Sequence, residues 1–193
     1  MAHNIPSLSN RNSARLHPVE MRFAPLFCFG LLTLACALAS FAFACATPFA
    51  AFAVIAAATL PLRPALLVVA AAWLINQAIG FGALGYPHDL NTVAWGFVIG
   101  AAALTATVAA VLVLRTAASV TLPIAFGLAL ACAYAAYELV LFAATPALGG
   151  AGDFTLVIVA RLAALNVLWF VGLLVACEVA RLLGADRQSH VVS

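Results

Sequence analysis

Two ionisable side chains stand inside long apolar segments of the sequence, and they are the first candidates for chemistry. Glu138 lies in the segment 120–144 and Arg161 lies in the segment 154–174. A charge at membrane depth costs about 2.5–3.5 kcal/mol on insertion scales, so such residues commonly mark binding sites, ion pairs or relays. The sequence predicts that Glu138 and Arg161 either pair with one another or meet a polar ligand.

Polar and aromatic residues accompany these two charges at a similar depth. Counting from the expected outer end of each segment places Glu138, Arg161 and Asn76 roughly 9–12 Å deep, at about 1.5 Å per residue. We expect one polar layer, whose candidate ligand-binding residues are Asn76, Gln77, Glu138, Arg161, Asn166, Tyr134 and Trp95. Tyr137 and Trp169 would add aromatic walls. Alternatively, the same groups only join helices, through an ion pair and hydrogen bonds.

Motifs for other chemistry are missing from the sequence. It holds no glycine-rich phosphate loop, no HExxH motif and no GxSxG motif, so catalysis is unsupported and no cofactor is predicted. The five cysteines form no CxxC pair and are expected to be small buried hydrophobes rather than metal ligands. His88 and Asp89 form a polar turn with too few ligands for a metal.

The composition places these residues in a membrane. Of the 193 residues, 67% are hydrophobic and 7% are charged, whereas a soluble domain carries roughly 25% charged residues. A net charge of +2 is too small and too scattered for a nucleic-acid surface. All basic residues are arginine and alanine is abundant, which suggests a GC-rich bacterial genome. We expect a multi-pass protein of the bacterial cytoplasmic (inner) membrane, surrounded by lipid.

Six apolar segments are expected to be helices that cross this membrane. Residues 1–22 are expected to form a disordered cytoplasmic tail, and residues 184–193 a second cytoplasmic tail. The second segment is the shortest and has Pro48 in its first turn, so it could be tilted or partly re-entrant. The sixth is expected to continue as a helix to about residue 183. The six segments are 23–44, 45–62, 65–84, 92–114, 120–144 and 154–174.

The positions of the arginines predict the orientation. With the N-terminus inside, seven of the eight arginines lie in cytoplasmic pieces, and the outer turns carry only Asp89 and Asp153. This follows the positive-inside bias and predicts an all-α protein with six transmembrane helices and both ends in the cytoplasm. The run after Arg22, which ends at residues 44–46 (Ala-Cys-Ala), also resembles a signal peptide. Its cleavage would leave five spans.

The short-looped segments, the polar layer and the Ala35-x-x-x-Ala39 spacing in the first segment resemble the substrate-binding S-components of energy-coupling-factor transporters. The resemblance covers the membrane region and rests on architecture. It implies capture of a vitamin or metal from outside, and docking through small residues of the first helix onto a membrane subunit driven by ATPases. By this analogy, Ala35 and Ala39 face the partner, while Asn76, Gln77, Glu138 and Arg161 touch the substrate.

Two functions from different classes follow from these features. The first is binding or transport of a small polar solute through an outward-facing pocket, in a larger transporter that includes another membrane subunit and an ATPase module. The second is a non-transporting accessory or assembly protein, whose intramembrane polar residues serve helix packing.

Overall fold

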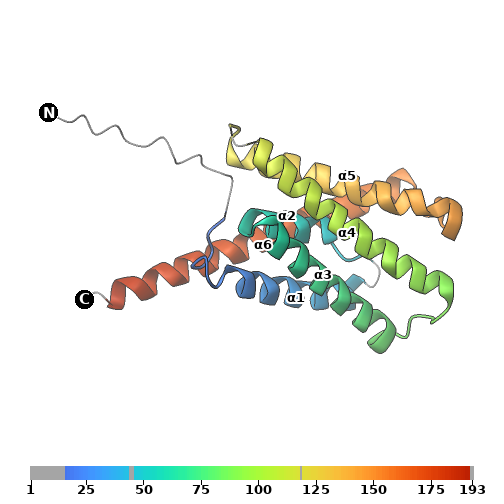
Figure 1. The fold of residues 1–193 in the computed structure, drawn as a ribbon, viewed down its shortest axis with the longest axis horizontal. Coiled ribbons are helices and arrows are strands. Elements are labelled where there is room, and N and C mark those ends of the chain that lie inside the picture. The colour runs from blue at the N-terminus through green and yellow to red at the C-terminus, as the bar shows by residue number, and fades with distance from the viewer. Residues whose placement is uncertain (1–15, 44–45, 118, 192–193) are drawn as a thin grey trace.

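The chain folds into a bundle of long apolar helices (Figure 1). A computed structural model describes residues 16–43, 46–117 and 119–191, and it contains helices and no strand within these ranges. In this described part of the chain, five elements are long and apolar enough to cross a membrane. These are α1 (Ala24–Phe43), α3 (Leu62–Ala78) with its π-helical continuation η1 (Ile79–Ala83), α4 (Leu90–Thr116), α5 (Leu122–Leu148) and α6 (Leu156–Val191). The protein is therefore an all-α, multi-pass membrane protein.

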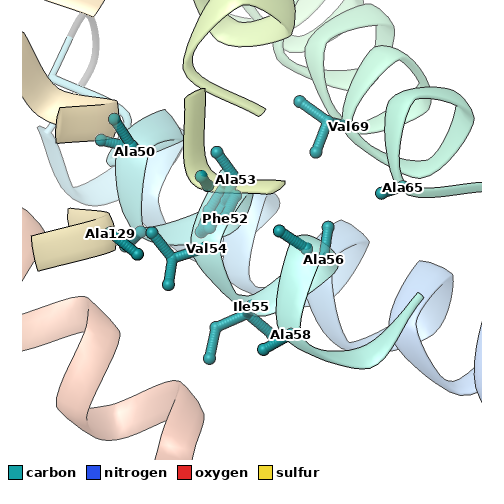
Figure 2. Close-up of a cluster of buried hydrophobic side chains, with 14 of the residues drawn as sticks. Ala50, Phe52, Ala53, Val54, Ile55, Ala56, Ala58, Ala65, Val69 and Ala129 are labelled. Carbon is teal, nitrogen blue, oxygen red and sulfur yellow. The ribbon is translucent and has the colours of Figure 1, made fainter. Parts of the chain in front are cut away.

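The remaining helix, α2 (Phe49–Thr59), is short and completely enclosed. Its 11 residues are all buried, and α1, α3, α4, α5 and α6 all pack against it. In Figure 2, Val54 of α2 lies beside Ala129 of α5, and Val69 of α3 belongs to the same buried cluster. At 1.5 Å per residue α2 is about 17 Å long, well short of a hydrocarbon core of about 30 Å. The predicted span 45–62 is thus wrong in its bounds, because residues 46–48 are not helical and Leu60 is extended.

Hydrogen bonds between helices define their directions. The Sγ atom of Cys36 lies 3.1 Å from the carbonyl oxygen of Ala72, and Nδ2 of Asn76 lies 2.9 Å from Oγ of Ser40. Both pairs are 36 residues apart, so α1 and α3 run parallel. The Leu16 amide, before α1, donates to the Ala58 carbonyl at the end of α2 over 2.8 Å, so α2 runs against α1.

The later helices continue this alternation, so α1 begins and α6 ends at the same end of the bundle (Figure 1). Three arginines outside the apolar runs also lie toward this end: Arg22 before α1, Arg63 in the first turn of α3 and Arg115 in the last turn of α4. Such an arrangement is compatible with both ends in the cytoplasm, and the side of the membrane stays a prediction.

Several chain ends differ from the sequence predictions. Residues 16–22 were assigned to a disordered tail, but Leu16 and Val19 pack against the core. Helix α6 continues to Val191, through most of the predicted C-terminal tail. Cys132 is exposed, whereas Cys28, Cys36 and Cys177 are buried as expected. Residues 1–15 and the central positions of the possible cleavage site, 44–45, lie outside the described residues.

Helix α5 passes through Pro146, where the sequence predicted a turn. Proline has no amide proton, so the carbonyl oxygen of Phe142, four residues earlier, loses its usual helical donor. The Thr145 hydroxyl donates to that oxygen instead, over 2.9 Å. The helix ends three residues later at Gly149, whose φ of 83° is readily adopted only by glycine.

Glycines bring α3 and α4 close together. The Trp73 ring of α3 lies over Gly100 of α4, and its Nε1 donates to the Gly96 carbonyl over 2.8 Å. A Cβ atom on Gly100 would lie 2.6 Å from Cε2 of Trp73. The spacing Gly96-x-x-x-Gly100 is the small-residue pattern that permits close helix contact in lipid.

We expect Gly100→Ala to destabilise the bundle, because the hydrogen bond to Gly96 restrains the Trp73 ring that the new methyl group would meet. Overpacking costs about 1–3 kcal/mol, which outweighs the gain of about 1 kcal/mol in helix propensity. Thermal unfolding in detergent measures the change. Gly30→Ala is the matched control, because a Cβ there meets nothing within 4 Å. Equal unfolding temperatures for the two variants would contradict the prediction.

The turn before α4 is held by Asp89. Its Oδ1 accepts from the Thr92 amide at 3.0 Å and its Oδ2 accepts from the Thr92 hydroxyl at 2.8 Å. These hydrogen bonds favour the carboxylate and hold the pKa of Asp89 below its usual range. Asp89 is thus the N-cap of α4, which satisfies one of the free amides at the helix start.

The cap should make the start of α4 sensitive to acid. With a lowered pKa in the folded state, the contribution of Asp89 is complete above its unfolded pKa of about 3.9 and is lost as the pH falls through the folded value. Asp89→Asn keeps an acceptor that does not titrate. We expect the wild type to lose stability relative to Asp89→Asn below about pH 4, measured by thermal unfolding. Parallel pH profiles would rule out this role.

Candidate functional site

A groove between α5 and α6 is a feature that could receive a ligand. These helices are consecutive in the chain but touch at few places, whereas α4 and α5 pack closely. The groove has a volume of about 680 Å³. We call it the α5–α6 groove; its walls include Phe126, Gly127, Leu130 and Tyr134 of α5 and Asn166 and Phe170 of α6. Apart from Tyr134 and Asn166, its wall is apolar.

Asn166 lies in this wall but serves the neighbouring helix. It is 6% exposed, and its Oδ1 accepts from the Ala51 amide of α2 at 3.1 Å. Its Nδ2 donates to the Leu162 carbonyl at 3.0 Å. Pro48, at the N-cap position of α2, provides no side-chain cap. Asn166 therefore caps α2 from another helix and also forms part of the groove wall.

Tyr134 and Glu138 are one turn apart on α5. The Tyr134 hydroxyl donates to the Val159 carbonyl of α6 over 2.7 Å and so bridges the two helices. Oε1 of Glu138 is buried without a hydrogen-bond partner. Glu138 and Tyr134 line a cavity of about 580 Å³, together with Phe142 and Val159, which we call the Glu138 cavity. Because Tyr134 also lines the α5–α6 groove, it lies at the boundary of both spaces.

Arg161 lies elsewhere, so the predicted pair with Glu138 is wrong. Among the described residues, the ion pairs are Glu20–Arg22 and Glu178–Arg181. The second pair joins two residues three apart on α6. Glu138 faces Val159, whereas Arg161 lies in a different cavity against Phe41 of α1. The two charged residues therefore line different cavities and have different neighbours.

Asn76 and Gln77 join the first half of the bundle. Nδ2 of Asn76 donates to the hydroxyls of Ser40 and Thr47, both at 2.9 Å, and Nε2 of Gln77 donates to Oδ1 of Asn76 at 3.0 Å. Gln77 also packs over Gly96 of α4. The structure therefore separates these two predicted ligand-binding residues from the α5–α6 groove, and they connect α1, α3 and α4.

Most of the residues predicted to form aromatic walls or to dock a partner pack in the core instead. Tyr137 stacks on Phe49 with 6.3 Å between ring centroids, and Trp169 meets Phe52 edge-on at 6.5 Å. Trp95 is half-buried on α4 and lines none of the cavities described here. Ala35 and Ala39 are 5% and 0% exposed. A partner cannot dock on these two alanines in this conformation, because other helices of the same chain cover them.

The groove residues Phe126, Gly127 and Phe170 were not predicted from the sequence. A weak indication existed, since Gly127 is a glycine inside a long helix, where glycine lowers helix propensity unless space is needed. Within residues 16–43, 46–117 and 119–191, no three His, Cys, Asp or Glu side chains gather to hold a metal ion.

Comparisons of the chain with protein-family models, with curated proteins and with solved structures find no match.

Removing the Asn166 side-chain oxygen should destabilise the bundle. Asn166→Leu keeps a similar volume but leaves the Ala51 amide buried without an acceptor, which costs about 1–3 kcal/mol. Thermal unfolding in detergent measures the loss. Val171→Ala on the same helix is the control, because Val171 is 52% exposed and its loss breaks no hydrogen bond. If Asn166→Leu unfolds no earlier than this control, Asn166 is not needed as a cap.

Proposed function

We propose that this is a bacterial inner-membrane protein that binds a small amphipathic solute in the α5–α6 groove, as the solute-binding subunit of a larger transporter. The carrying observation is the groove itself, which stays open between two consecutive helices in an otherwise closely packed bundle. Its volume of about 680 Å³ is within the range of about 300–1,000 Å³ common for ligand pockets.

The walls favour a ligand with an apolar body and one polar group. Phe126, Leu130 and Phe170 offer only apolar surface, so a fully polar solute would lose its water without replacement. Tyr134 and Asn166 are the polar residues of the groove wall, and Glu138 lies one turn beyond Tyr134. The ligand class thus changes from the small polar solute expected from the sequence to an amphipathic one.

The second candidate is an accessory or assembly protein that transports nothing. It is favoured by the hydrogen bonds of Asn76, Gln77 and Asn166, all of which join parts of this chain. Copurification with an ATPase-bearing membrane complex would favour the transporter, in which a coupling subunit would meet a surface other than Ala35 and Ala39. The orientation with both ends in the cytoplasm belongs to the same proposal and is testable by cysteine accessibility at each end.

Filling the groove should abolish ligand binding without harming the fold. A Cβ at Gly127 meets nothing within 4 Å, so Gly127→Leu places a new side chain in the open space. The probe is a photoactivatable long-chain fatty acid added to the protein in nanodiscs, and crosslinks are mapped by mass spectrometry. We expect crosslinks on the groove residues of α5 and α6 to fall about tenfold, equivalent to about 1.4 kcal/mol of lost binding.

Gly172→Leu is the matched control, since Gly172 is also a helical glycine with nothing within 4 Å and lies outside the groove. It should leave the crosslinks unchanged. Equal labelling of the wild type and Gly127→Leu would refute ligand binding in the groove. That outcome, with both variants folded, would favour the accessory protein.

A further inference from the structure

Arg161 lies in a cleft separate from the α5–α6 groove. The cleft has a volume of about 660 Å³ and lies between the C-terminal end of α1 and the first turns of α6. We call it the Arg161 cleft; its walls include Phe41, Ala42 and Ala46, with Ile158, Leu165 and Leu168 of α6. Alanines on the α1 side leave the space open.

The guanidinium of Arg161 lies apart from the acidic side chains that the structure describes. None of those carboxylates lies within ion-pair distance of it, since the ion pairs of the described residues involve other arginines. An arginine near hydrocarbon is stabilised by an anion or by reaching the interface. Its planar fork of N–H donors matches phosphate oxygens well, because two parallel hydrogen bonds can form at once.

The order of residues along α6 resembles the order of groups in a phospholipid. Arg161 is five residues from the start of α6 at Leu156, or about 8 Å from the helix end. Leu165 and Leu168 follow at i+4 and i+7 on the same face, deeper in the bundle. The cleft thus presents a cation near the helix end and an apolar wall below it.

We propose that the Arg161 cleft binds an anionic phospholipid, with its phosphate on Arg161 and an acyl chain along Leu165 and Leu168. The site is independent of the solute proposed for the α5–α6 groove, because the two cavities share no lining residue. A lipid held there would also cover the gap between α1 and α6.

Native mass spectrometry of the purified full chain tests this site. The protein is titrated with phosphatidylglycerol and, separately, with the zwitterionic phosphatidylcholine. We expect the wild type to retain phosphatidylglycerol preferentially, and Arg161→Gln to lose this preference about tenfold, as for the loss of one charge-assisted contact. Arg161→Lys should retain part of it, because a lysine keeps the charge but not the two-pronged geometry.

Two further variants make the test specific. Arg115→Gln removes the same charge at the opposite end of the bundle and should keep the lipid preference. Ala42→Trp fills the cleft without changing any charge and should lose the lipid, which keeps the test valid if Arg161→Gln folds poorly. Unchanged phosphatidylglycerol binding in folded Arg161→Gln, an equal loss in Arg115→Gln, or displacement of the lipid by millimolar inorganic phosphate would each overturn the proposal.

Discussion

The hydrogen bond from the Ala51 amide to Oδ1 of Asn166 closes the end of a helix that water cannot reach. Helix termini leave free amides and carbonyls, and at membrane depth each must find a partner within the protein. At the other end of α2, the Leu16 amide donates to the Ala58 carbonyl, and the Thr59 hydroxyl donates to that of Ile55. Residues far apart in the chain thus form hydrogen bonds with the two ends of one short helix.

This demand explains why the predicted polar layer does not form a single pocket. Its uncharged members form hydrogen bonds between helices. Asn166 accepts from an amide of α2, and Asn76 donates to a hydroxyl of α1 and to one in the segment before α2. Tyr134 ties α5 to α6 at the Val159 carbonyl. Away from this contact, α5 and α6 meet at few places, and the groove lies between them.

The five long helices were predicted well from the sequence, since a run of 18 or more apolar residues is typical of a transmembrane helix. The sequence could not delimit α2, because hydropathy does not distinguish helical residues from the extended apolar residues flanking them. The same apolar runs correctly placed Glu138 and Arg161 within long helices, while their depth in the membrane stays a prediction. Which neighbouring helix each of these side chains faces could not be predicted, because the helices are apolar on every side and no face is marked as buried. Likewise, the Ala35–Ala39 spacing indicates close helix contact but does not identify the neighbour.

Because Glu138 and Arg161 are separated, the charged residues do not join helices as the uncharged polar residues do. A mutual ion pair would satisfy both charges and leave neither for a ligand, and joining the two helices would then be its only role. Here the amides and hydroxyls join the helices, while the two charges open on different cavities. A cation in an apolar setting costs free energy that a bound anion offsets. The separation that removes the predicted ion pair therefore leaves Arg161 open to an anion in its own cleft.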